Sequence, residues 1–136
     1  MKQSERVIEF IETFCTLGES YLGKQFKVLP FQRDIIEKIY QEDDEGKRLI
    51  RQAVITMPRK NAKTTLVAAL CVYHLIADDT DSAPLVVAAA GDRAQARLVH
   101  DAIKTMIQGS SELSSVCTVY RNEIKCHRNK GVARVV

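Results

Sequence analysis

The stretch that decides the fold is LIRQAVITMPRKNAKTT, residues 49–65. Its first part, residues 49–57, is rich in β-branched side chains and predicts a strand. A short loop with three cationic side chains follows. Residues 63–76 are apolar on nearly every side, which predicts a buried helix. A strand, a basic loop and a helix therefore follow one another directly.

The basic loop can be aligned with the phosphate-binding pattern GxxxxGK[ST], in which Lys63 takes the lysine position and Thr64 the hydroxyl position. Met57 and Ala62 stand where the pattern has glycines. In such a loop, backbone N–H groups surround a phosphate and the N-terminus of the helix faces the anion. Closely spaced cations would repel one another on a plain surface loop, whereas an anion held between them explains their presence. We therefore interpret the segment as a phosphate site.

The rest of the chain places this loop in an α/β fold. Apolar residues at helical spacing predict two helices before it, over residues 5–22 and from Pro30 onward. Residues 85–90 are an uncharged apolar run typical of a strand covered on both faces, and a helix is expected after Gly91. This order predicts a βαβ unit with a parallel sheet in a three-layer fold. Short strands, including a hairpin, are expected over residues 116–120, 124–128 and 132–136.

The composition narrows the function classes. The 136 residues carry 20 Lys+Arg against 17 Asp+Glu, a net charge of +3, and 46% are hydrophobic. These values are typical of one globular domain and support a polyanionic partner only weakly. The apolar runs are too short to span a membrane, so we expect a cytoplasmic protein with no membrane contact. The four cysteines form no CxxC pair and are interpreted as buried reduced thiols.

Several other polar residues are candidates for binding. Gln32 could pair with the edge of an adenine and Phe31 could pack on the base, although an exposed glutamine at a helix start is commoner. The three histidines lack Asp or Cys at ligand spacing, so we expect satisfied or solvated rings and no metal site. A basic row at helical spacing predicts a solvated helix face, or alternatively a contact surface for a DNA backbone; it consists of Arg93, Arg97 and Lys104.

Together these segments resemble the large subunit of tailed-phage terminase, the motor that packages DNA. The resemblance rests on LPFQ at residues 29–32, PRKNAKTT at 58–65 and AAAGDRAQA at 88–96. The family is known for a deviant phosphate loop of the form PRKNxK[ST], so the absent glycines fit it. The resemblance implies a helical lead-in over residues 1–28 and, over residues 29–136, part of a P-loop ATPase core of the additional-strand, catalytic-glutamate type.

The resemblance also implies roles for individual residues. Thr64 would bind Mg²⁺, and Gln32 would read adenine. Asp92 and Gln95 match the helicase-like motif that couples nucleotide to DNA. The residues that would surround the phosphates of ATP are Arg59, Lys60, Asn61, Ala62, Lys63, Thr64 and Thr65.

The family further implies a parent protein that drives double-stranded DNA into a viral capsid in a bacterial host, with a terminase small subunit and a portal protein as partners. It also requires an Asp-Glu pair at the end of a further strand and a C-terminal nuclease domain. Neither is found in this sequence, so we expect an N-terminal fragment without a catalytic acid. The terminal apolar run, Val132 to Val136, is expected to leave an open strand edge that favours self-association.

Two alternatives remain open at the level of the sequence. One is a fragment of a helicase-like DNA-dependent ATPase of another lineage, which shares the Gln32 and Lys63 features. The other is a non-catalytic remnant that binds nucleotide or DNA without chemistry.

Overall fold

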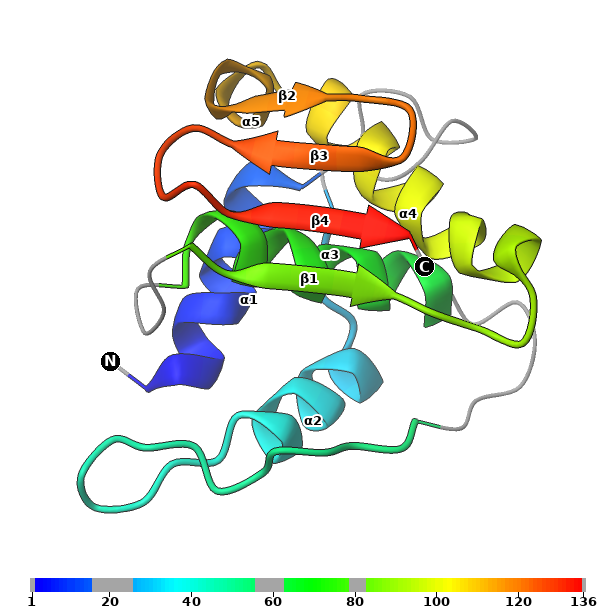
Figure 1. Cartoon of the computed structure of the whole chain (residues 1–136). Coiled ribbons are helices and arrows are strands. Elements are labelled where there is room, and N and C mark those ends of the chain that lie inside the picture. The colour runs from blue at the N-terminus through cyan, green and yellow to red at the C-terminus, as the bar shows by residue number, and fades with distance from the viewer. Residues whose placement is uncertain (1, 16–25, 56–62, 79–82, 136) are drawn as a thin grey trace.

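The computed structural model describes residues 2–15, 26–55, 63–78 and 83–135 (Figure 1). It confirms the expected α/β class, with two helices ahead of an alternating region and short strands at the end. The elements are α1 (Gln3–Phe14), α2 (Pro30–Ile39), α3 (Lys63–Ile76), β1 (Leu85–Ala88), α4 (Arg93–Gln108), α5 (Ser111–Val116), β2 (Cys117–Val119), β3 (Glu123–Cys126) and β4 (Val132–Val135).

The strands form one mixed sheet in the order β1-β4-β3-β2. β1 and β4 run parallel, with Leu85 opposite Val132, whereas β2 pairs with β3 and β3 with β4 in antiparallel fashion. The C-terminal hairpin is therefore present. The parallel pair joins β1 to the last strand of the chain rather than to the segment before the basic loop. β4 is paired on both sides, so the open edge predicted at residues 132–136 is wrong for the described residues of that strand.

A strand is expected over residues 49–57. This prediction is wrong for residues 49–55, which form neither a strand nor a helix, and residues 56 and 57 lie outside the described residues. This segment runs past α2, away from the sheet (Figure 1). Val54 is 89% exposed. β-Branched residues favour a strand only where a neighbouring strand supplies hydrogen bonds and a surface to pack on. No described strand pairs with this segment, so its propensity is not realised.

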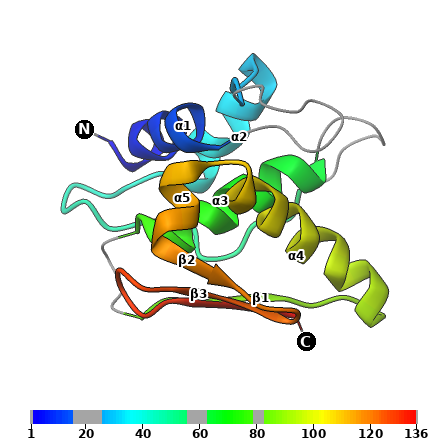
Figure 2. The ribbon, with the colours of Figure 1, turned by 90° about the horizontal axis from the view of Figure 1, so that it is seen from above.

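The molecule has three layers, which Figure 2 shows edge-on: the sheet, then α3, α4 and α5, then α1 and α2. The described helices therefore all lie on one side of the sheet. On β1, exposure alternates along the strand, and Leu85 and Val87 on the uncovered face are 60% and 47% exposed. The expectation that this strand is covered on both faces does not hold within the described residues.

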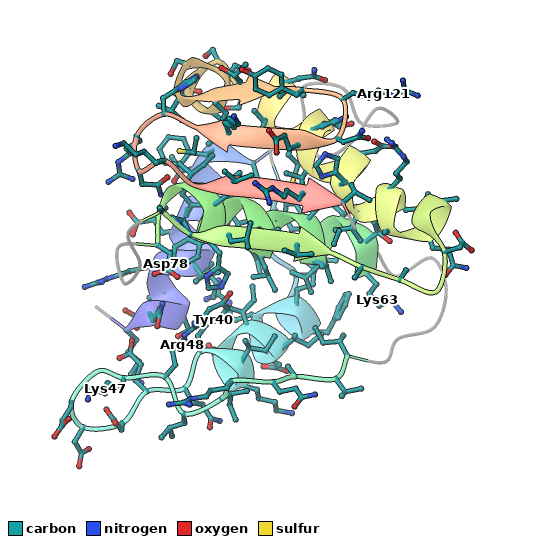
Figure 3. All side chains as sticks on the ribbon, viewed as in Figure 1. Tyr40, Lys47, Arg48, Lys63, Asp78 and Arg121 are labelled. Carbon is teal, nitrogen blue, oxygen red and sulfur yellow. The ribbon has the colours of Figure 1, made fainter. Side chains whose placement is uncertain are left out.

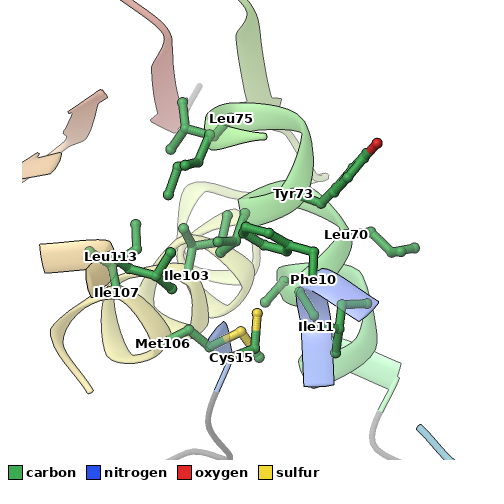
Figure 4. Packing of buried hydrophobic residues seen from close by; sticks show 14 of the residues in the cluster. Phe10, Ile11, Cys15, Leu70, Tyr73, Leu75, Ile103, Met106, Ile107 and Leu113 are labelled. Atoms are coloured by element: carbon green, nitrogen blue, oxygen red, sulfur yellow. The ribbon is translucent and has the colours of Figure 1, made fainter. Parts of the chain in front are cut away.

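The core lies between α1, α3, α4 and α5 (Figure 4). The nearly all-apolar α3 is the central element, because it contacts α1, α4 and β1 together. Its fully buried residues include Leu66, Val72 and Leu75. Burial of each such side chain contributes about 1.5–3 kcal/mol to the stability of the folded state. This packing fixes the direction of α3 and therefore the position of its N-terminus.

A row of hydrogen-bonded polar side chains, partly buried, connects the C-terminal end of α2 to the C-terminal end of α3. The Tyr40 hydroxyl lies 2.6 Å from Nε2 of His74, and Nδ1 of His74 lies 2.8 Å from a carboxylate oxygen of the buried Asp78. Because a carboxylate can only accept, Nδ1–H of His74 donates to Asp78, and with the proton on Nδ1 the Nε2 atom can accept a hydrogen bond from the Tyr40 hydroxyl. Burial raises the pKa of Tyr40 well above its usual range. The C-terminal ends of both helices are thereby joined, and their N-terminal ends lie on the same side of the molecule (Figure 1).

Candidate functional site

The N-terminus of α3 is the centre of the candidate site. Lys63 is the first residue of the helix, Lys63 and Thr64 are exposed, and Thr65 is half-buried. Figure 3 shows Lys63 on the side of the molecule where β1 ends. The first N–H groups of a helix have no intrahelical acceptor, and the helix dipole is positive there, so the position favours an anion. Residues 59–62 of the predicted phosphate loop lie outside the described residues.

A cleft of about 520 Å³ opens beside Lys63. It lies between α3, the carboxyl end of β1 and the first half of α4. Ligands of open α/β sheets bind beyond the carboxyl ends of the strands, and clefts of this size hold small molecules. The polar residues that line it are Lys63, Gln95, His100 and Arg134.

The predicted coupling motif starts α4 and reaches the same cleft. A carboxylate oxygen of Asp92 accepts the backbone N–H of Gln95 at 2.9 Å and caps the helix. Such a cap stabilises a helix by about 1 kcal/mol. Gln95 itself lines the cleft with Lys63. The structure therefore brings two motifs together that are far apart in sequence.

His100 is the one histidine for which the sequence-based expectation is wrong. Its ring is fully buried, and neither ring nitrogen has a hydrogen-bond partner among the described residues. Burial lowers its pKa, and Lys104 and Arg97 lower it further, while Asp101 opposes them. The ring is therefore neutral at pH 7. The other two rings are satisfied, by Asp78 and Tyr40 around His74 and by Thr118 beside His127.

Gln32 has a structural role in α2 that the sequence analysis missed. The side chain is 2% exposed, and its Oε1 accepts the backbone N–H of Leu29 at 2.9 Å. Pro30 at the first helical position and a glutamine two residues later are the signal that could have revealed this cap. Phe31 is more exposed, with 40% of its surface open to solvent. A contact of Gln32 or Phe31 with adenine stays a prediction.

The basic row on α4 holds the β2–β3 turn. The guanidinium of Arg97 donates to the side-chain oxygen of Asn122, and Lys104 Nζ donates to the carbonyl of Arg121 at 2.6 Å. These two side chains are therefore anchors of the turn rather than members of a merely solvated face. The side chain of Arg93 lies outside the described residues.

No group of three or more His, Cys, Asp or Glu side chains that could hold a metal ion occurs in the described parts of the chain. The cysteines are free thiols. Burial raises the pKa of Cys15 and Cys117 to about 12 and that of Cys71 to about 11, so these thiols stay protonated. None of the described helices is both long and apolar enough to cross a bilayer.

The chain is an α/β domain with a mixed sheet, and its cleft lies at the end of a strand beside a helix N-terminus, where ligands of α/β proteins commonly bind. The chain belongs to the family described as the terminase large subunit, ATPase domain, whose sequence pattern matches residues 30–136. This result confirms the resemblance.

Two comparisons with the large terminase of Enterobacteria phage HK97 agree with this assignment. The chain is 32% identical to that protein over 117 residues, which are 85% of this chain and 22% of the relative. The crystal structure of the HK97 large terminase superposes with a TM-score of 0.83 at 25% identity, and covers 100% of this chain and 27% of that one. The chain thus spans about a quarter of the length of these relatives.

Proposed function

We propose that this chain is the nucleotide-binding part of an ATP-driven motor that packages double-stranded DNA. The observation that carries the proposal is the position of Lys63, at the start of α3 and on the wall of the cleft, in a chain of the terminase ATPase family. Family membership favours this function over a helicase of another lineage. The small subunit, the portal protein and the bacterial cytoplasm belong to the same proposal.

Lys63 would neutralise the charge of the β- and γ-phosphates, and the exposed hydroxyl of Thr64 on the first turn of α3 suits one ligand position of Mg²⁺. The metal, when bound, supplies charge neutralisation during phosphoryl transfer. The loop residues before the helix would complete the phosphate cradle; they are Arg59, Lys60, Asn61 and Ala62.

Hydrolysis needs a carboxylate beside the γ-phosphate to orient water. None of the described residues that line the cleft is an aspartate or a glutamate. The buried Asp78 lies beyond the opposite end of α3, roughly 20 Å away at about 1.5 Å per residue, and Asp92 caps α4. We therefore propose that this chain binds ATP and Mg²⁺ but does not hydrolyse ATP alone.

The coupling of nucleotide to DNA would use α4. Gln95 on its first turn lines the cleft, and Arg97 and Lys104 further along hold the β2–β3 turn. A shift of α4 on nucleotide binding would therefore move the exposed Arg121. We propose that Arg121 contacts a DNA phosphate, because its side chain is cationic and exposed.

The test is calorimetric titration of the chain with ATP and Mg²⁺. Lys63→Ala should weaken binding at least tenfold, the equivalent of one lost charge-assisted hydrogen bond. Lys47→Ala is the matched control, because Lys47 is exposed at the other end of the molecule (Figure 3). Absence of binding, or equal affinity in wild type and Lys63→Ala, would disprove the phosphate site. Steady ATP hydrolysis that depends on Lys63 would contradict the proposed lack of turnover.

A further inference from the structure

Two of the four cysteines face each other across the β2–β3 hairpin. In the register of these strands, Cys117 lies directly opposite Cys126. The backbone N–H of His127 donates to the carbonyl of Val116 at 2.7 Å. This bond joins the residue after one cysteine to the residue before the other, so the cysteines form a non-hydrogen-bonded pair of the antiparallel ladder. Their side chains therefore leave the sheet on the same face, at a position where opposite side chains come close together.

The pair has the spacing that a disulfide requires. Opposite residues of a non-hydrogen-bonded pair have Cα atoms about 4.5 Å apart, and disulfides join Cα atoms that lie about 4.4–6.8 Å apart. Both thiols are free and buried in the core. The pKa of Cys117 is raised to about 12, chiefly by burial and in addition by the charge of Cys126 and a side-chain hydrogen bond to it. The two thiols are therefore already in contact in the reduced protein.

The pair lies at the end of the hairpin that is far from the turn. Three residue pairs connect β2 to β3, and the cysteines are the pair most distant from the turn. Arg97 and Lys104 of α4 hold the turn itself. A covalent bond between the cysteines would fix the hairpin at its other end as well. Cys15 follows α1 and Cys71 lies within α3, so the other two cysteines are not part of the sheet.

We propose that Cys117 and Cys126 form a reversible disulfide by exchange with a low-molecular-weight disulfide such as oxidised glutathione. One protein thiol, as its thiolate, attacks a sulfur of the oxidant, whose S–S bond breaks and releases one glutathione thiolate. The second protein thiolate attacks the protein sulfur of this mixed disulfide and releases the other glutathione. The protein gives up two electrons and two protons, and the oxidant becomes two thiols. This inference does not depend on nucleotide binding.

Refolding of the reduced 136-residue chain from urea in a glutathione redox buffer tests the proposal. All thiols are accessible while the chain is unfolded, so burial in the folded state does not limit the reaction. After alkylation of the remaining thiols, mass spectrometry should show a bond between Cys117 and Cys126. Trypsin cleaves after Arg121 and Lys125, which lie between the two cysteines, so the bond should appear as two linked peptides.

The same buffer series in concentrated urea supplies the reference. Because the fold holds the two thiols together, the equilibrium constant for oxidation should be at least about thirtyfold larger in the folded chain than in the unfolded chain. Cys117→Ala and Cys126→Ala should each remove the bond, whereas the matched control Cys71→Ala should keep it. If one of these variants does not fold, the linked peptides of the wild type still decide the result.

Four outcomes would overturn the proposal. They are a folded chain that stays fully reduced, a mixed disulfide with glutathione as the final product, a bond that joins other cysteines or two chains instead, and an equilibrium constant no larger than in urea.

Discussion

Replacement of the buried His100 by phenylalanine should stabilise the fold. The ring is fully buried, and both of its nitrogens lack hydrogen-bond partners among the described residues. A buried polar group without a partner costs about 1–3 kcal/mol of stability. Phenylalanine has a ring of similar shape without this penalty, and the adjoining cleft gives room for its extra ring atom. After roughly 1 kcal/mol is subtracted for imperfect packing, the net gain should be about 0–2 kcal/mol.

The pH dependence gives the same variant a second readout. Burial lowers the pKa of His100 in the folded state, while the unfolded chain keeps a pKa near 6.5. As the pH falls below about 6.5, the unfolded state takes up a proton that the folded state does not, so wild-type stability declines. This decline continues until the lowered folded-state pKa is reached. His100→Phe should remove this part of the acid sensitivity.

Urea unfolding followed by far-UV circular dichroism suits the measurement, because the chain has no tryptophan. A gain of up to about 2 kcal/mol corresponds to a rise in midpoint of up to roughly 1 M urea at about 2 kcal/mol/M. His127→Asn at the exposed His127 is the control, and should change stability by less than about 0.5 kcal/mol. A variant His100→Phe that is less stable than wild type, or that keeps the full acid decline, would refute the reasoning.

Two further outcomes are expected. Gln32→Glu keeps an acceptor for the N–H of Leu29, so the helix content measured by circular dichroism should not change. If the amide of Gln32 binds adenine, the affinity for ATP should fall in this variant. Equal affinity in wild type and Gln32→Glu would contradict that role. Cys15, Cys71 and Cys117 should react slowly with a thiol reagent at pH 8 and quickly after unfolding in urea, because burial holds their pKa values at about 11–12; fast labelling of the native chain would contradict this burial.

The elements that could be predicted are those whose own sequence pattern indicates burial, without knowledge of distant segments. The continuous apolar run of α3 reflects contacts on every side, and its start at Lys63 could be placed because a basic loop precedes it. The C-terminal strands could be predicted because each is short and bounded by turn residues. The capping role of Asp92 also rests on a local signal, an aspartate just before a helix, although the sequence analysis gave that residue a coupling role only.

The pairing of strands and the hydrogen-bond partners of buried polar side chains could not be predicted, because both depend on which residues lie opposite in space. The partner of β1 is β4, and the two strands are separated by α4, α5 and the hairpin. The isolation of His100 likewise results from the way α4 lies against α3 and the sheet. Periodicity places this residue on the inner face of a helix but does not show whether a donor or an acceptor is near.

Residues 49–55 and β1 show that strand propensity and strand formation are separate properties. Both segments are rich in β-branched residues, and the second becomes a strand because β4 provides hydrogen bonds along one side. The first has no such neighbour among the described strands and stays irregular, with Val54 in solvent. By the same reasoning β1 is a strand because of its pairing with β4 on one side, and no other described strand contributes to it.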